Sequence, residues 1–119
     1  MLFSSSHIWV EIQGEQVARI GISDFAQSSL EAIMFVNLPE VGETLCIGER
    51  FGDIESLKTV SDLISPLNGN VLAINEDLLD MPYAINEAPY DNWLVEANVE
   101  CLAEDLMDRL TYEEHTKSV

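Results

Sequence analysis

The stretch Ile54-Glu55-Ser56-Leu57-Lys58-Thr59-Val60-Ser61-Asp62-Leu63-Ile64 places one lysine between two short apolar segments. Residues 54–57 and 60–64 each have the length of a short strand, and a tight connection between them predicts a β-hairpin with Lys58 at its exposed tip. Leu57 and Val60 flank the lysine, so an enzyme that approached its amine would meet a short apolar patch. The sheet at the base would fix the root of this side chain while the tip stays accessible.

Two interpretations of Lys58 follow from its position alone. A lone lysine in a turn is usually only a solvated charge, and the other lysine, Lys117, lies near the polar end of the chain and needs no functional explanation. The alternative is a modification site, because an amide at the lysine nitrogen removes the charge and lengthens the arm.

Before this hairpin, the chain indicates further short strands. Residues 7–12 and 16–22 are separated by a turn and predict another hairpin. Ser23 is a suitable N-cap for a short helix through Leu30, and residues 33–36 form the strongest buried-strand pattern in the chain. The first half therefore predicts strands with one short helix.

After the hairpin, Asn68-Gly69 predicts a two-residue turn, with residues 71–74 leaving it as a strand. Residues 76–82 predict a loop or a single helical turn. Beyond Asn98 the apolar residues recur at helical spacing, which predicts an amphipathic helix that Asn98 caps and that ends near Arg109. The apolar residues of this helix are Val99, Leu102, Ala103, Leu106 and Leu110.

The predicted elements add up to a mainly β fold. We expect a small β-sandwich or flattened barrel with a short helix in the first half and a helix near the C-terminus. The length of 119 residues fits a single domain over residues 1–119, with a core at about 6–110 and a polar tail at 111–119 that is expected to fray.

Composition narrows the class of function. Apolar residues make up 47% of the chain, which is enough for a folded core, and no apolar run is long enough to span a bilayer. The N-terminal residues lack the features of a secretory or transit signal, so we expect a cytoplasmic protein without a membrane partner. A net charge of −17 argues against nucleic acid. This acidity serves either solubility alone or docking to basic patches on partner proteins.

The cysteines and histidines give no catalytic or metal-binding pattern. Cys46 and Cys101 lie far apart, and reduced thiols are favoured over a single disulfide in the expected compartment. Neither cysteine has a neighbour at metal-ligand spacing. His7 stands beside Trp9, where a packed or hydrogen-bonded role is favoured over a catalytic base. With no nucleophile–base–acid set and no Gly-rich phosphate loop, the sequence predicts a non-enzyme.

The residues around Lys58 resemble the Glu-Ser-Val-Lys-Ala lipoylation segment of the glycine cleavage system H-protein family. In that family the lysine carries a lipoyl group and a glutamate stands three residues before it, and Lys58 and Glu55 match those two positions. Four further segments follow in the family's order, and the similarity covers about residues 6–110. These segments are Ile20-Gly21-Ile22-Ser23-Asp24-Phe25-Ala26-Gln27, Phe35-Val36-Asn37-Leu38-Pro39-Glu40-Val41-Gly42, Ser65-Pro66-Leu67-Asn68-Gly69-Asn70-Val71, and Ile85-Asn86 with Pro89-Tyr90 and Trp93.

The resemblance implies a carrier protein of the barrel-sandwich type, in which two antiparallel sheets face each other. It implies (R)-lipoate attached to Lys58 as lipoamide, by a lipoate ligase or a lipoyl transferase that recognises Glu55. It also implies that Asp62, with Ser6 and His7, lines a cleft where the loaded arm rests. The implied partners are glycine decarboxylase, aminomethyltransferase and dihydrolipoyl dehydrogenase, and the carrier is expected to be a monomer without a metal ion.

Three departures from the family pattern bear on function. The family's Ser-His-Glu-Trp segment reads Ser6-His7-Ile8-Trp9 here, and Ile8 cannot accept a hydrogen bond from an ammonium group. The family's Leu-Gly-Asp reads Leu30-Glu31-Ala32, and the glycine before its last tryptophan is Asn92. These differences leave lipoylation intact, and they keep open an H-like lipoyl protein outside glycine cleavage, such as a lipoyl relay or a redox carrier.

A biotin carrier is the remaining carrier class. Its lysine usually lies between two methionines, whereas Leu57 and Thr59 flank Lys58 here. The sequence therefore disfavours biotin as the attached group.

Overall fold

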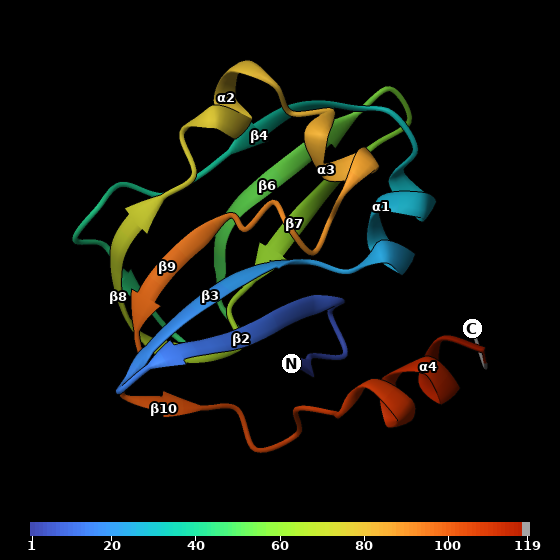
Figure 1. Cartoon of the computed structure of the whole chain (residues 1–119). Helices are drawn as coiled ribbons and strands as arrows, with labels where there is room; N and C mark the ends of the chain where they lie inside the picture. The colour runs from blue at the N-terminus through green and yellow to red at the C-terminus, as the bar shows by residue number, and fades with distance from the viewer. Residues whose placement is uncertain (118–119) are drawn as a thin grey trace.

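The computed structural model describes residues 1–117 as two antiparallel sheets with short helices at their ends (Figure 1). The larger sheet has the strand order β1-β2-β3-β9-β8-β10, and β5 also pairs with β8. The smaller sheet has the order β4-β6-β7. The strands of the larger sheet are β1 (Leu2–Phe3), β2 (Ile8–Gly14), β3 (Val17–Ile22), β5 (Thr44–Leu45), β8 (Leu67–Ile74), β9 (Val95–Asn98) and β10 (Cys101–Leu102). Those of the smaller sheet are β4 (Ile33–Asn37), β6 (Arg50–Ser56) and β7 (Val60–Ile64).

One apolar core joins the two sheets. Ile20 and Val71 from the larger sheet and Ile54 and Leu63 from the smaller sheet are all buried in the same cluster. Burial of each such side chain contributes about 1.5–3 kcal/mol to folding. The predicted mainly β sandwich is therefore confirmed. Among residues 1–117, no helix combines the length and the apolar character that a membrane span needs.

The first helix forms where the sequence predicts it. α1 spans Asp24–Leu30, and the Ser23 hydroxyl accepts a hydrogen bond from the Ala26 amide at 3.2 Å, which satisfies a free donor of the first turn. The hairpin before it is also confirmed, since β2 pairs with β3. Two further short helices, α2 (Asp77–Asp80) and α3 (Ala84–Glu87), lie between β8 and β9. The single helical turn expected within residues 76–82 is α2.

The prediction of a hairpin turn at Asn68-Gly69 is wrong, because both residues lie inside β8. Asn68 pairs with Cys101 of β10, and Gly69 pairs with Leu45 of β5. A Cβ atom at Gly69 would lie 1.9 Å from the carbonyl oxygen of Asn98, so the glycine permits close approach of two backbones. The Asn68-Gly69 pair therefore marks a close approach of two strands and not a turn.

The prediction of a helix from Asn98 to Arg109 is also wrong. Residues 95–98 and 101–102 are strands, and the last helix, α4, begins only at Arg109 and ends at Lys117. The Asn98 side chain accepts a hydrogen bond from the Asn70 amide at 2.6 Å, so it joins β9 to β8 and caps no helix. Sheet pairing thus overrides the helical spacing of the apolar residues.

The expected frayed tail is helical up to Lys117, and residues 118 and 119 lie outside the described residues. Tyr112 of α4 is buried and stacks on Phe3, with 4.5 Å between the ring centroids. This aromatic contact attaches α4 to β1.

Candidate functional site

The predicted hairpin around Lys58 is confirmed. β6 and β7 pair with Ile54 opposite Ser61 and Glu55 opposite Val60. The turn is closed by a hydrogen bond from the Ser56 amide to the Thr59 carbonyl at 2.8 Å, and the Ser56 hydroxyl accepts from the amides of Lys58 and Thr59 at 3.1 Å. These bonds fix the backbone at the root of the lysine, whose side chain is more than half exposed.

The amine of Lys58 reaches across to the end of α1. Its Nζ donates to the carbonyl oxygen of Ser29 at 3.3 Å and lies 3.8 Å from a carboxylate oxygen of Glu31. A backbone bond from the Leu57 amide to the Ala32 carbonyl, at 3.3 Å, also joins the hairpin to this connection. Figure 1 shows the turn between β6 and β7 on the same side of the molecule as α1.

Glu31 has an unusual backbone conformation for its residue type. Its φ is +62° and its ψ is −140°, a region that glycine enters much more readily than glutamate. The Asn86 side chain holds this conformation, because Nδ2 donates to the Glu31 carbonyl at 2.6 Å and Oδ1 accepts from the Ile33 amide at 2.9 Å. Sequence reasoning missed the roles of Glu31 and Asn86, and the only signal was the glutamate in place of the family's glycine.

A cleft with a volume of about 240 Å³ lies beside this contact. The structure brings together Ser6, His7 and Asp62 in its lining, as the sequence predicts. Ser29, whose carbonyl contacts the Lys58 amine, lines the cleft as well. The rest of the lining is mostly apolar and consists of Ile8, Ile22, Phe25, Ala26, Leu30, Ile54, Ser61 and Leu63.

His7 connects the cleft to the last helix. Its Nδ1 lies 2.7 Å from the Tyr112 hydroxyl, which in turn lies 2.7 Å from the Ser23 hydroxyl. Burial lowers the pKa of His7 below its usual value, and the charge of His115 lowers it further. The interpretation of His7 as a hydrogen-bonded residue is therefore confirmed.

Asp62 lies at the rim of the cleft with an exposed side chain. Its carboxylate accepts a hydrogen bond from Nε of Arg50 at 3.1 Å, and the same guanidinium also pairs with Asp53. The two carboxylates raise the pKa of Arg50 through these hydrogen bonds. Arg50 therefore fixes the position of the Asp62 carboxylate, a restraint that sequence reasoning did not anticipate.

Glu55 stands apart from the other predicted site residues. It lies in β6 between Phe35 of β4 and Val60 of β7, which are its partners in register, and it is absent from the lining of the cleft. Ser6 and His7 thus belong to the cleft alone, Glu55 lies beside the exposed hairpin, and Asp62 lines the cleft at its rim while standing two register positions from Glu55 on the outer face of the smaller sheet.

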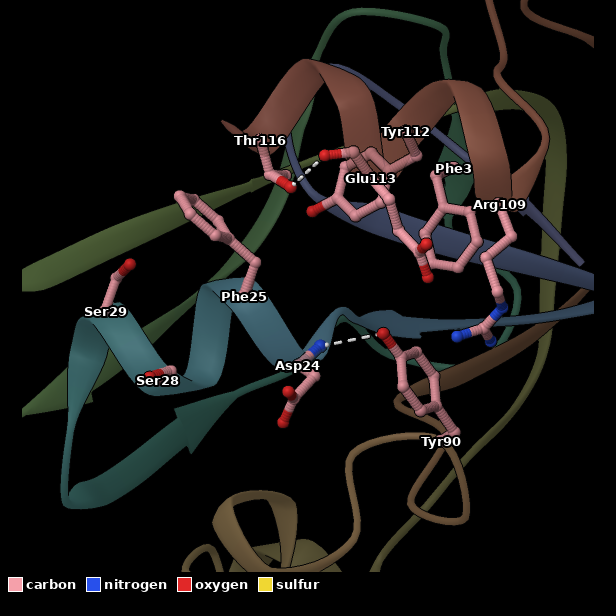
Figure 2. Close-up of a pocket in the computed structure, with 10 residues that line it drawn as sticks. All are labelled: Phe3, Asp24, Phe25, Ser28, Ser29, Tyr90, Arg109, Tyr112, Glu113 and Thr116. Atoms are coloured by element: carbon pink, nitrogen blue, oxygen red, sulfur yellow. Dashed lines mark hydrogen bonds between the residues drawn. The ribbon is translucent and has the colours of Figure 1, made fainter. Parts of the chain in front are cut away.

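A larger cavity of about 450 Å³ lies between α1 and α4 (Figure 2). The Arg109 guanidinium lies over the rings of Phe3 and Tyr90, at 5.3 and 5.0 Å from their centroids. The Tyr90 hydroxyl accepts a hydrogen bond from the Asp24 amide at 3.0 Å. No predicted site residue lines this cavity. The contacts of Arg109 with the two rings help to hold α4 in place, so this arginine has a structural role. We therefore place the candidate site at Lys58 and the smaller cleft.

Other reactive side chains add no second site. Within residues 1–117, no group of three or more histidine, cysteine or acidic residues is arranged to hold a metal ion. Cys46 and Cys101 are free thiols. A hydrogen bond with Glu49 raises the pKa of Cys46, which makes its thiol less reactive.

The fold and the site define a small carrier domain, in which a two-sheet scaffold presents one exposed amine at a hairpin tip beside a mostly apolar cleft. Comparison with known proteins specifies the family. A family model described as "Glycine cleavage H-protein" matches residues 1–119, and the chain belongs to this family.

Individual relatives agree with the family model. The glycine cleavage system H protein of Bacillus subtilis is 49% identical over 118 residues, which cover 97% of this chain and 92% of the relative. That of Clostridioides difficile is 48% identical over 102 residues, covering 86% and 82% of the two chains. The crystal structure of the H protein from Mycobacterium marinum superposes with a TM-score of 0.91 at 34% identity, covering 98% of this chain and 95% of the other.

Membership of this family establishes the general function. The chain is a lipoyl carrier of the glycine cleavage system, it is not itself an enzyme, and proteins of its family carry the lipoyl group covalently. It works with the other proteins of that system. Of the alternatives that the sequence left open, the biotin carrier and the H-like protein outside glycine cleavage are therefore set aside.

Proposed function

We propose that Lys58 carries the lipoyl group as an amide and that this arm transfers the aminomethyl group among glycine decarboxylase, aminomethyltransferase and dihydrolipoyl dehydrogenase. The observation that carries the proposal is the exposed Lys58 amine at the tip of a hairpin whose backbone is fixed by Ser56. When attached, the lipoyl group supplies the sulfur atoms that bind the aminomethyl group and that are reoxidised afterwards. Tethering raises the effective concentration at each enzyme to the order of millimolar.

The residues near Lys58 fit such an arm. Ser29 contacts the lysine nitrogen and also lines the cleft, so the cleft lies next to the point where the arm is attached. Buried Ile8 and Ile54 give the cleft apolar walls suited to a hydrocarbon arm.

The polar groups that line the cleft suit a charged aminomethyl group. Asp62 offsets the positive charge, and Arg50 holds its carboxylate in place. Ser6 and His7 supply further hydrogen-bonding groups in the lining. We assign these three residues to sheltering the loaded arm.

A lipoate ligase or a lipoyl transferase attaches the group, and we assign recognition of the hairpin to Glu55. We propose that the carrier acts as a monomer, which leaves the arm on Lys58 open to each partner in turn. We place it in the cytoplasm, where its free cysteines remain reduced. Its net charge of −17 argues against contact with nucleic acid or an anionic membrane.

Intact-mass spectrometry of the protein purified from its own cells tests the proposal. We expect a lipoyl-sized mass increment on the wild type and none on Lys58→Arg, which keeps the charge and removes the acceptor amine. An unmodified wild-type protein, or an increment that persists in Lys58→Arg, would refute the assignment. Glu55→Ala should slow modification without abolishing it.

A further inference from the structure

The outer face of the smaller sheet carries a cluster of exposed apolar side chains next to Lys58. Leu57, Phe35, Val60 and Met34 are 78%, 61%, 56% and 43% exposed. Single exposed apolar residues are common on soluble proteins, but a contiguous group marks an interaction surface. We call these four residues, together with Glu55, the tip face.

The strand register explains how the tip face forms. Phe35, Glu55 and Val60 stand opposite one another across β4, β6 and β7, so their side chains form one row across the sheet. Ile54, the neighbour of Glu55 in β6, is fully buried on the other face. A carboxylate therefore stands between two exposed apolar side chains, close to the lysine.

A β-bulge adds one more apolar side chain to this face. The register between β4 and β6 shifts between Ile33 and Phe35, so Met34 is the extra residue of the edge strand. Regular alternation would turn Met34 and Phe35 to opposite faces, whereas both are exposed here. The bulge thus enlarges the apolar surface beside Lys58.

Acidic side chains stand next to the apolar row. Two residues further along each strand, Asn37, Asp53 and Asp62 are the register partners. Arg50 pairs with both carboxylates of this row and neutralises only part of their charge. A partner that fits this surface has an apolar centre with basic groups around it.

The chemistry at Lys58 selects one occupant. An enzyme that acylates the lysine must bring an activated carbonyl to about 3 Å from Nζ, so its body must cover the hairpin around Leu57 and Val60. The enzymes of glycine cleavage act on the far end of the arm, roughly 10 Å beyond Nζ for a chain of about eight bonds. They do not need to contact the root.

We propose that the tip face is the docking surface for the enzyme that attaches the lipoyl group to Lys58, and that this enzyme places an apolar surface on Phe35 and Val60 and a basic group opposite Glu55. The proposal rests on the proposed function in one respect, that Lys58 is the lipoylated residue. It adds a surface to which β4, which is remote in sequence from the lysine, contributes Phe35 and Met34.

The test uses the full chain with unmodified Lys58, lipoate, ATP, Mg²⁺ and a purified lipoate–protein ligase, with lipoylation followed by intact mass. The variants are Phe35→Thr and Val60→Thr. Ile12→Thr is the matched control, because Ile12 is 52% exposed on β2 of the other sheet. Threonine keeps the β-branched shape that strands favour, and unfolding temperatures check that each variant is folded.

We expect kcat/KM for lipoylation to fall at least about fivefold in Phe35→Thr and Val60→Thr, mainly through KM, and to stay within about twofold of wild type in Ile12→Thr. Reoxidation of the reduced arm by dihydrolipoyl dehydrogenase should stay within about twofold in all three lipoylated variants.

Equal lipoylation of Phe35→Thr and Ile12→Thr, at a Lys58 that is modified normally, would overturn the docking surface and leave the proposed function intact. Equal losses in lipoylation and in reoxidation would overturn the choice of occupant. A wild-type chain that the ligase does not modify at Lys58 would instead refute the proposed function itself.

Discussion

Lys58 depends on its neighbours for both position and access. The hydroxyl of Ser56 fixes the turn, and the carbonyl of Ser29 receives the amine. An exposed ion pair such as the one between Lys58 and Glu31 contributes at most about 1 kcal/mol, so it orients the amine without holding it back from an enzyme.

Ile8 is buried in the wall of the cleft, in a position where its family has a glutamate. Ile8→Glu should speed loading of the aminomethyl group a few-fold in a decarboxylase assay, because a carboxylate there would offset the ammonium charge. The same change should cost about 1–3 kcal/mol of folding free energy, since the carboxylate is buried before loading. Ile8→Gln, which is similar in size and uncharged, should not speed loading, and equal rates for all three proteins would contradict the prediction.

The histidine of the cleft should make stability depend on pH. Burial lowers the pKa of folded His7 below the unfolded value of about 6.5, so the unfolded chain binds the proton more readily. The contribution of His7 is therefore fully present above pH 6.5 and is lost as the pH falls below that value. Thermal unfolding between pH 8 and pH 5 should show a steeper loss for wild type than for His7→Gln, and parallel curves would contradict this cause.

At the scale of elements, the connection between α1 and β4 supports the hairpin that bears the lysine. Its residue Glu31 has a positive φ, which Asn86 stabilises through hydrogen bonds on both sides. A conformation of this kind costs roughly 1–3 kcal/mol in a residue other than glycine. The chain therefore accepts local strain where α1 meets the Lys58 amine.

Glu31→Gly should relieve that strain. We expect the free energy of unfolding to rise by about 1 kcal/mol, because the relief exceeds the extra freedom that glycine gives the unfolded chain. Differential scanning calorimetry should show this as a higher Tm, whereas Asn86→Ala should lower the Tm through the loss of its hydrogen bonds to the Glu31 carbonyl and the Ile33 amide. A lower Tm for Glu31→Gly would show that its side-chain contact with Lys58 outweighs the strain.

At the scale of the whole molecule, the surplus of acidic residues serves either solubility alone or docking to basic partners, and the effect of salt distinguishes the two. If the charge of −17 steers basic partners, the rate of association should fall as salt screens it. We expect kcat/KM for lipoylation to fall several-fold between roughly 20 and 300 mM NaCl, with kcat nearly constant. A kcat/KM independent of salt would mean that the acidity serves solubility alone. Addition of sucrose, which changes viscosity without screening charge, is the control.

The sequence by itself determined what local patterns encode. Two short apolar segments indicated the strands on either side of Lys58, and Ser23 indicated the start of α1, because strand pairing in a short hairpin and helix capping both depend on neighbours in the chain. The ordered segments around Lys58 also indicated the family and with it the two-sheet fold.

Only the tertiary structure decided what depends on contacts between distant segments. Asn68-Gly69 lies in a central strand because β5 and β10 flank it. Asn98 and residues 101–102 belong to the sheet because Asn98 pairs with β3 and β10 pairs with β8. Long-range pairing of this kind outweighs local propensity by satisfying backbone groups and burying side chains together. The same reason applies to the site. The hydrogen bond from the Ile33 amide to Asn86, the contact of Arg50 with Asp62 and the pairing of Phe35 with Glu55 form only when the sheets are assembled.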